Sequence, residues 1–566
     1  MMRTNSRYVR GLLTFIALII SIGLGKQASA SIEINDQEVF ENPNNTISAV
    51  YSIHGSGISS AYIEYMCLDC DEREESDPEW ERTPTFAVEF ERFILPVLGL
   101  LPDSAYTMRA VLIDSLGSQI VTDPLPFGTG SLPDALDIPF NPTYTIPSVG
   151  YVLISQSSTF SQARGYVIAL DKECRIAWYV QIQNSRIQSL VSISDMQTIM
   201  IHVVRNDGSM RYYEIDLFGN IVALHKVPMY PSEEDLGLDN HEFLHLMNGE
   251  KIFMCRKHYI LDMTPYGGPT NATVMSNRVR RVSTDGEIVF DWGYMDTFPL
   301  TDTQEPLDGP IVDWVHANSI DIDEDGNYIL SSRSFSEVTK ISSQDGSVIW
   351  RLGGKNNQFT FVGDNLGGFS QQHAARDLGD GHLLLFDNGR DHCIKQSRAV
   401  EYRLDLNDMT ATLVWDYRYN PVIYAQALSN AQRLPGGNTL INYASLYSGR
   451  PRIIEVSPSG ERLWELKMPF DYSGSGCYRA FKLESLYFGT NRVPEYQDLD
   501  GDGWFGYFDC NEQDPQIHPG VGDLCDGIDQ DCNGFDGVDE IPDNGIDDNC
   551  NGRIDESEGC FVGVVM

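Results

Sequence analysis

Short alternations of apolar and polar residues, separated by turns rich in glycine, aspartate and asparagine, cover most of this 566-residue chain. Between about residues 150 and 470 they recur as a loose unit of about 40 to 55 residues. Each unit has a strand that ends in a D/N-G or G-N turn, then two more strands, a D-x-x-G turn, and a last strand with Trp or another large apolar residue. The segment DEDGNYILSSRSFSEVTKISSQDGSVIWRL shows the whole pattern.

Six copies of this four-stranded unit can be traced, and helical periodicity is almost absent. Four-stranded sheets repeated around an axis are the blades of a β-propeller. The repeats therefore predict an all-β protein whose main body, residues 140–490, is a six-bladed β-propeller and carries the chemistry. A seven-bladed ring is the main structural alternative.

The region before the repeats, residues 31–135, is predicted to form a small β-sandwich. It contains alternating segments such as TISAVYSIHG and SAYIEYMCLD between Gly, Pro and Asp turns. The stretch GLLPDSAYTMRAVLID resembles the late strands of fibronectin type III domains, with Tyr106 as the corner tyrosine. We expect a structural role for this domain, which a proline-rich linker joins to the repeats.

The first 30 residues have the pattern of a secretory signal peptide. A basic start is followed by an apolar run from Gly11 to Leu24 and by an A-x-A cleavage site that ends at Ala30. The alternative is an uncleaved anchor helix, but the run is short for a span of ~20 residues. We therefore expect an exported bacterial protein, periplasmic or extracellular, with no transmembrane segment beyond the signal peptide.

The charge is strongly negative and unevenly distributed. The formal net charge is −41, and removal of the four basic residues in residues 1–30 leaves 36 − 81 = −45. Such a charge argues against nucleic acid and anionic membrane surfaces as partners. Residues 495–566 hold 20 acidic residues and a single basic one, Arg553, so this tail needs cations.

The acidic tail, residues 495–566, contains three twelve-residue loops with oxygen ligands at positions 1, 3 and 5, glycine at 6 and an acidic residue at 12. This is the pattern of an EF-hand calcium loop, although no flanking helices are evident. The run DCNEQDPQIHPGVGDLCDGIDQDCNGFDGVDE resembles the Cys- and Asp-rich metal-binding repeats of secreted bacterial proteins. We expect Ca²⁺ in these loops; the alternative is a solvated acidic tail. The expected ligands are Asp498, Asp500, Asp502, Asp509, Asp529, Asp531, Asn533, Glu540, Asp547, Asn549, Asn551 and Glu558.

The chain has eleven cysteines, which are candidate disulfide partners in an exported protein. Cys67 and Cys70 form a C-x-x-C motif, but no βαβ pattern surrounds them. A local disulfide or free thiols are therefore favoured over a thioredoxin-like site.

Three of the eleven histidines fall at equivalent places in three consecutive repeats. His241 and His373 each lie seven residues before the first turn of their unit, and His316 lies nine residues before it. Because side chains alternate between the two faces of a strand, the two extra residues leave the His316 side chain on the same face. The innermost strands of propeller blades line one channel. We therefore expect the three imidazoles to meet at one channel mouth.

Antiparallel pairing brings basic residues back to the same mouth. The hairpin after His316 places residue 334, give or take one, opposite it, so Arg333 returns beside His316. The same folding-back places Arg256 near His241, and Asp387 or Asn388 near His373. A cationic mouth suits an anion with tetrahedral oxygens. Two alternatives stay open: a zinc ion on the histidines, which Arg333 opposes, and a structural hydrogen-bond ring.

The segment DWVHANSIDIDEDGNYILSSRSFSEVTKI, followed by IWRLGG, looks like the central motif of bacterial arylsulfotransferases. QQHAARDLGDGHLLLFDNG and NHEFLHLMNGE are similar to the neighbouring blades of that family, and the likeness covers most of residues 140–470. The resemblance implies a PAPS-independent transfer of a sulfuryl group from a phenolic sulfate to a phenol, with no catalytic cofactor. It implies that His373 is the nucleophile of a sulfohistidine intermediate. His241, His316 and Arg333 would hold the sulfuryl oxygens, with Asn318 beside them.

Two other functions compete with this one. The first is a non-catalytic surface propeller that binds a partner or a glycan, with calcium stiffening a stalk; such a protein has no need for the histidine and arginine set. The second is a quinone-dependent dehydrogenase, but those propellers usually have eight blades and Trp docking repeats that are not seen in this sequence.

Overall fold

The structure is a computed structural model that describes most of the chain between residues 31 and 487. The described residues are 31–70, 80–136, 139–140, 142–145, 150–157, 165–182, 185–193, 198–205, 210–227, 229–230, 233, 236–469 and 477–487, with scattered positions between 500 and 532. The predicted signal peptide, residues 1–30, lies outside them.

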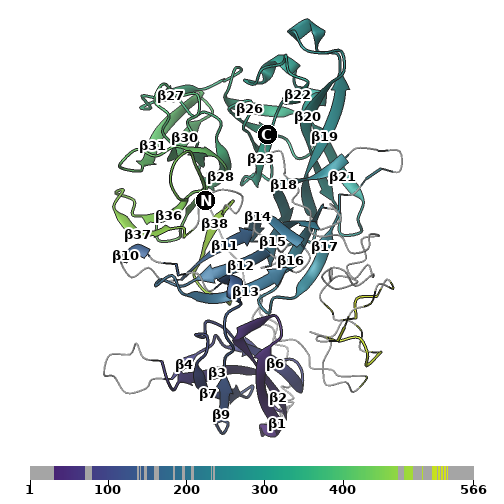
Figure 1. Ribbon diagram of the computed structural model, residues 1–566, viewed down its shortest axis with the longest axis vertical. Helices are drawn as coiled ribbons and strands as arrows, with labels where there is room; N and C mark the ends of the chain where they lie inside the picture. The colour runs from purple at the N-terminus through teal and green to yellow at the C-terminus, as the bar shows by residue number, and fades with distance from the viewer. Residues whose placement is uncertain are drawn as a thin grey trace, which may run out of the picture.

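The N-terminal domain consists of two antiparallel sheets around one apolar core, drawn in purple in Figure 1. Ile53, Ile63, Phe93 and Met108 are fully buried between the sheets. The hydroxyl of Tyr106 accepts a hydrogen bond from the backbone N–H of Leu101 at 2.8 Å, which is the bond that a corner tyrosine makes. One sheet has the order β1 (Glu33–Asn42), β2 (Asn45–Ser56), β6 (Arg92–Val97); the other contains β4 (Glu81–Arg82), β3 (Ser60–Cys67), β7 (Ala105–Ile113) and β8 (Gln119–Val121), with β5 (Phe86–Ala87) on β3 and β9 (Leu125–Gly128) on β7.

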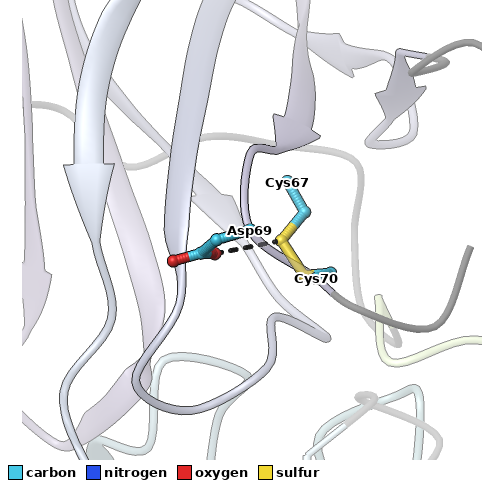
Figure 2. Close-up of side chains that lie close together, drawn as sticks. All are labelled: Cys67, Asp69 and Cys70. Carbon is cyan, nitrogen blue, oxygen red and sulfur yellow. Dashed lines mark hydrogen bonds between the residues drawn. A yellow bond between two sulfur atoms is a disulfide. The ribbon is translucent and has the colours of Figure 1, made fainter.

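The C-x-x-C motif forms a local disulfide between Cys67 and Cys70 at the end of β3 (Figure 2). Asp69 lies beside the bridge and accepts a hydrogen bond from the backbone N–H of Ala105 at 2.9 Å. The bridge therefore closes the end of β3 against the start of β7. Among the described cysteines, four have free thiols: Cys174, Cys255, Cys393 and Cys477.

The described residues between 142 and 483 form a series of sheets around a common centre (Figure 1), antiparallel except for the parallel pairs β20–β22 and β27–β31. The first sheet has β13 (Ile176–Ile182), β12 (Gly165–Leu170), β11 (Tyr151–Ser157) and β38 (Ala480–Leu483); the second has β14 (Ser185–Ile193), β15 (Ile199–Arg205), β16 (Met210–Ile215) and β17 (Ile221–His225); the third has β18 (Leu236–His245), β19 (Lys251–Leu261), β20 (Ala272–Val282) and β21 (Ile288–Gly293), with β22 (Ile311–Asp313) on β20.

The remaining sheets continue around the same centre. The fourth has β23 (Ala317–Ile322), β24 (Tyr328–Ser332), β25 (Glu337–Ile341) and β26 (Val348–Gly353); the fifth has β27 (Thr360–Val362), β31 (Thr410–Arg418), β30 (Arg398–Asp405), β29 (His382–Asp387) and β28 (His373–Gly379); the sixth has β10 (Pro142–Thr145), β37 (Arg462–Lys467), β36 (Arg452–Val456), β34 (Thr439–Tyr443) and β33 (Asn430–Arg433). A short pair, β32 (Ala425–Ala427) and β35 (Ser445–Leu446), one α-helical turn, α1 (Tyr294–Thr297), and two 3₁₀ turns, η2 (Thr264–Tyr266) and η3 (Leu300–Asp302), complete this part.

The prediction of an all-β, propeller-type protein is confirmed. Among the described residues the ring shows six sheets. Innermost strands contact one another in the order β14, β18, β23, β28, β33 and β38, and β11, which pairs with β38, contacts β14. The number of blades in the whole protein stays a prediction.

Tryptophans on the last strand of the repeat join neighbouring sheets. The indole N–H of Trp178 donates to the carbonyl of Leu217 in the second sheet at 3.0 Å, and that of Trp464 donates to Lys172 in the first sheet at 3.2 Å. Both side chains are 1% exposed, so each buries a large apolar area between two sheets. This is why the repeat pattern carries a large apolar residue at that position, and the contact of Trp464 joins the last sheet to the first.

The ring is fastened by strands from both of its chain ends. Strand β38 pairs antiparallel with β11, with Ala480 opposite Ile154, and Figure 1 shows the two side by side. Strand β10 pairs with β37, with Thr145 opposite Trp464. The first sheet thus takes its innermost strand from the end of the ring, and the sixth takes its outermost strand from the beginning.

The N-terminal domain is attached to the first two sheets by specific polar contacts. The amide of Asn42 donates to the carbonyl of Phe218 at 3.0 Å, and the backbone N–H of Thr46 donates to the hydroxyl of Tyr179 at 3.1 Å. After the ring closes, the hydroxyl of Tyr487 accepts a hydrogen bond from Leu98 in the N-terminal domain at 2.9 Å.

Candidate functional site

The three aligned histidines meet at one end of the innermost strands. His241 lies in β18, His316 immediately precedes β23, and His373 is the first residue of β28. The ring centroids of His241 and His316 are 5.0 Å apart, and those of His316 and His373 are 6.3 Å apart. Three imidazoles from three neighbouring sheets therefore form one cluster at the place that the sequence alignment predicts.

The backbone is strained where three of the innermost strands begin. His316 has a φ of 48°, Gln371 and Ala374 beside His373 have φ values of 50° and 53°, and Ser429, the counterpart before β33, has a φ of 83°. Non-glycine residues with positive φ are uncommon and cost on the order of 1–3 kcal/mol. At His316 the conformation is held by a hydrogen bond from the backbone N–H of Arg333 to the carbonyl of His316 at 3.0 Å. That bond also brings Arg333 back beside His316, within one residue of the position expected from antiparallel pairing.

Each histidine is oriented by a different partner at Nδ1. Nδ1 of His241 bonds Oδ1 of Asp239, and Nδ1 of His316 lies 2.5 Å from Oδ2 of Asp313. Nδ1 of His373 instead lies 2.7 Å from Oδ1 of Asn388, which is neutral. Carboxylates stabilise a charged imidazolium, whereas an amide oxygen only fixes the tautomer. Nδ1 of the first two histidines thus faces a carboxylate, and Nδ1 of the third faces a neutral acceptor.

The orientation of the Asn388 amide determines the tautomer of His373. Its Nδ2 donates to the carbonyls of Ala425 at 2.8 Å and Leu428 at 3.3 Å, so the atom facing His373 is the acceptor Oδ1. Nδ1 of His373 must therefore carry the hydrogen, and Nε2 carries a free lone pair. Nε2 is buried and has no hydrogen-bond partner among the described residues.

Electrostatics keep His373 neutral. Burial, followed by the nearby His316 and Arg333, holds the pKa of His373 well below its ordinary value. Burial also lowers the pKa of His241, although Asp239 opposes this. A neutral, buried imidazole with an unpaired Nε2 is a nitrogen nucleophile at working pH.

Arg333 supplies positive charge beside the cluster. Its Nη1 lies 3.6 Å from Oδ2 of Asp313, its Nε has no hydrogen-bond partner among the described residues, and its side chain is 15% exposed. Although burial raises the pKa of Asp313, His316 and Arg333 outweigh it and lower that pKa. Asp313 therefore stays ionised between them, and Arg333 keeps donors free for a ligand.

The two residues expected to bind substrate, Arg256 and Asn318, also make contacts within the protein, and their binding of substrate stays a prediction. Arg256 pairs with Oδ2 of Asp239 through Nη2 at 3.0 Å, and so supports the partner of His241. The amide of Asn318 donates to the carbonyl of Gln372 at 2.8 Å and accepts from the N–H of Ala374 at 3.3 Å. Asn318 thus holds the backbone on both sides of His373.

Of the pair Asp387 and Asn388, only Asn388 reaches His373. Asp387 turns away and pairs with Arg398 at 3.0 Å and with His392 at 2.9 Å. Asp239 and Asp313 were not predicted from the sequence, although Asp239 lies two residues before His241 and Asp313 three residues before His316. That short D-x-H or D-x-x-H spacing is the signal that could have found them.

A buried ion-pair network lies next to the cluster and was not expected. Glu242, which is 0% exposed, pairs with Nη1 of Arg479 at 2.9 Å and with Nη2 of Arg376 at 2.7 Å. Nη2 of Arg479 also donates to the carbonyl of Asn318 at 2.9 Å. Arg479 immediately precedes the closing strand β38, so the network ties the closure of the ring to the strand that carries His241 and to the residue that holds the backbone of His373.

We expect Arg479→Met to destabilise the protein by about 3–5 kcal/mol, because it leaves Glu242 buried with one partner fewer. The free energy of unfolding in urea, followed by tryptophan fluorescence, measures the loss. Arg376→Met is the matched control: the Arg376 side chain is 25% exposed against 2% for Arg479, so its loss should be smaller. Equal losses for the two variants would contradict the account.

Of the twelve calcium ligands expected in the tail, only Asp500 and Asp529 are among the described residues. The other ten, Asp498, Asp502, Asp509, Asp531, Asn533, Glu540, Asp547, Asn549, Asn551 and Glu558, lie outside them. Within the described part of the chain, no helix is long and apolar enough to span a bilayer.

The family model described as "Arylsulfotransferase (ASST)" matches residues 145–479, which span the whole histidine cluster and Arg333. The chain belongs to the arylsulfotransferase family. A second family model, described as a metal-binding motif, matches residues 509–537 and 535–556 of this arylsulfotransferase-family protein, within its acidic tail. No curated protein matches the chain significantly.

Solved structures with low sequence identity are similar to this arylsulfotransferase-family chain in fold alone. A Bacteroides caccae protein of unknown function is 13% identical, with 59% of this chain and 99% of that chain covered and a TM-score of 0.38. The β-propeller domain of Cps50 (Swd1) from Myceliophteria thermophila is 12% identical, with 58% and 90% covered and a TM-score of 0.33. An inactive virginiamycin B lyase from Staphylococcus aureus is 15% identical, with 51% and 73% covered and a TM-score of 0.30.

Proposed function

We propose that this protein transfers a sulfuryl group from a phenolic sulfate ester to a phenol, through a covalent intermediate on Nε2 of His373. The observation that carries the proposal is the buried Nε2, which has no partner in the described part of the chain and whose lone pair is set free by the hydrogen bond from Nδ1 to Asn388. An unsatisfied buried polar atom costs about 1–3 kcal/mol, and at His373 this atom belongs to the ring that meets His316 of the neighbouring sheet.

In the first half-reaction the Nε2 lone pair attacks sulfur, a nitrogen–sulfur bond forms, and the bond from sulfur to the aryl oxygen breaks. The phenolate leaves with the electron pair, and a proton from the Asp313-bound His316 neutralises it. Arg333 and His241 hold the non-bridging oxygens, whose charge is spread over the transition state. Most of the catalysis is positioning and charge stabilisation, as in phosphoryl transfer.

In the second half-reaction His316 takes the proton of the acceptor phenol. The phenolate oxygen attacks sulfur, and the nitrogen–sulfur bond breaks with its electron pair returning to Nε2 of His373. The cycle is a ping-pong exchange between two aryl groups and requires neither a nucleotide sulfate nor a catalytic metal.

The test is incubation of the purified protein with p-nitrophenyl sulfate, with and without phenol. Release of nitrophenolate that depends on phenol and shows ping-pong kinetics supports the proposal. If the protein is inactive with several phenolic donors, a non-catalytic surface propeller becomes the better account.

We also propose that the protein is exported after removal of residues 1–30, and that its tail binds calcium. The supports are the signal-peptide pattern and the oxygen-ligand spacing of the tail loops.

The pH dependence of the first turnover provides a further check. Because the pKa of His373 is lowered, its neutral form persists below pH 6.5. The rate of nitrophenolate release should therefore not fall between pH 8 and 6.5 through protonation of His373. Asn388→Asp places a carboxylate on Nδ1, which stabilises the imidazolium and raises the pKa, so the acid-side loss should move to higher pH by about one unit or more. Stopped-flow pH profiles of the two proteins measure this, and identical profiles would contradict the assigned tautomer.

A further inference from the structure

Outside the histidine cluster, a second group of side chains with metal-binding atoms lies between the second and third sheets. Oε2 of Glu214 lies 3.0 Å from Nε2 of His225, and Oε1 of Glu214 lies 2.5 Å from Nδ1 of His245. The three candidate ligand atoms all lie within 4.8 Å of one another. Glu214 comes from β16, His225 ends β17, and His245 ends β18.

Strand register explains why these residues meet. Glu214 pairs with Ala223 across β16 and β17, and His225 lies two positions further along β17, so the two side chains share a face of the second sheet. In the third sheet, Phe243 and His245 share a face of β18. The ring of Phe243 stacks on His225 at 4.8 Å, and the rings of His225 and His245 meet edge-on at 5.9 Å.

The charge at this cluster is unbalanced. The Glu214 side chain is 4% exposed, and its ion-pair partners among the described residues are the two histidines, with no Lys or Arg. The similar pair of His382 and Glu401 differs, because Arg433 bonds the second oxygen of Glu401 and supplies a full positive charge. Burying a carboxylate without a cation is costly. At Glu214 a second histidine takes the place that Arg433 has beside Glu401.

We propose that Glu214, His225 and His245 bind one divalent transition-metal ion of the zinc class. Two imidazole nitrogens and one carboxylate oxygen are the ligands that zinc prefers, at about 2.0–2.2 Å. The side chains of His225 and His245 are 10% and 14% exposed, so the site is shallow enough for a water molecule as fourth ligand. Each histidine coordinates after its hydrogen moves to the other ring nitrogen.

The role of this ion is structural: it joins the second sheet to the third. His245 lies four residues after His241 on the same strand, ~13 Å away at ~3.3 Å per residue. The ion therefore holds the far end of the strand that carries His241 and Asp239. The site is separate from the oxygen-rich loops expected in the tail and from the proposed sulfuryl transfer.

Cobalt(II) titration of the full-length protein tests the site. The protein is freed of metal with chelator and then saturated with Ca²⁺, so that oxygen-ligand loops are filled. Tetrahedral Co²⁺ with nitrogen ligands absorbs visible light strongly, whereas octahedral Co²⁺ on oxygen ligands absorbs weakly. We expect one strongly absorbing equivalent that Zn²⁺ displaces, and an affinity at least about tenfold weaker in His225→Gln and His245→Gln. His382→Gln, which removes the matched histidine–glutamate pair, should bind Co²⁺ like wild type.

A thermal measurement gives an independent readout. Zn²⁺ should raise Tm of the calcium-saturated wild type by a few degrees and leave His245→Gln unchanged. The inference is overturned if strong absorption persists in His225→Gln, if it is lost instead in His316→Gln, or if only weak absorption appears. Nitrophenolate release is assayed in parallel. If the wild-type protein releases no nitrophenolate, the proposed sulfuryl transfer is contradicted, but the proposed metal site is not.

Discussion

His373→Ala is expected to abolish sulfuryl transfer, with a rate loss of at least about 10⁴-fold, because its Nε2 is the one ring nitrogen of the three histidines that is buried without a hydrogen-bond partner among the described residues. Nδ1 of His373 donates to Asn388, and Nε2 faces no protein partner among the described residues. Nitrophenolate release from p-nitrophenyl sulfate with phenol as acceptor measures the loss.

The same experiment should locate the covalent intermediate. Wild-type protein quenched rapidly after mixing with donor alone should carry one sulfuryl group on the peptide that contains His373, detected by mass spectrometry. His258→Ala is the matched control, because His258 is exposed on β19 and should leave turnover unchanged. Unfolding curves of both variants check the fold. If His373→Ala keeps normal turnover, the nucleophile must be His241 or His316.

Arg333→Ala is expected to lower the rate by on the order of 10²-fold or more, the usual cost of removing one donor to developing negative charge. Arg333 is mostly buried beside His316, and its Nη1 lies 3.6 Å from Oδ2 of Asp313, longer than a hydrogen bond. Substrate binding should weaken as well, because the donor ester is already an anion.

The conservative variant separates charge from geometry. Arg333→Lys should retain more activity than Arg333→Ala and less than wild type, because lysine keeps the charge but loses the planar fork of donors. Arg333 should never carry the sulfuryl group, since a guanidinium is not a nucleophile at working pH. Arg403→Ala, at an exposed position of β30, is the control. Equal rates for Arg333→Ala and wild type would remove Arg333 from the mechanism.

Sequence reasoning located the three histidines and Arg333 because their positions depend on local periodicity. Each innermost strand and the turn after it can be recognised in the sequence, and antiparallel pairing then predicts that Arg333 lies beside His316. The observed bond from the N–H of Arg333 to the carbonyl of His316 lies within one residue of that expectation. The same reasoning could not choose between Asp387 and Asn388, since alternate strand residues point to opposite faces and a one-residue uncertainty exchanges them.

Arg479 and the closing strands were not found, for a different physical reason. Strands β10 and β38 are four residues long, too short for periodicity to be read, and their partners lie about 320 residues away in the chain. Nothing local in the chain marks Arg479 as the partner of Glu242, whereas a strand and the turn that follows it are marked by their own residues. The parts of the site that are built from hairpins can thus be predicted from the sequence, whereas the parts that depend on closure of the ring cannot.

The late arrival of β38 has a consequence for biogenesis. While the chain is still being synthesised, the first sheet has strands β11 to β13 but an open inner edge at β11, because β38 lies near the C-terminal end of the ring. Unpaired strand edges readily add foreign strands. We therefore expect the nascent chain to need a chaperone until residue 483 has been synthesised. A ribosome that stalled before that point would release a fragment prone to aggregate.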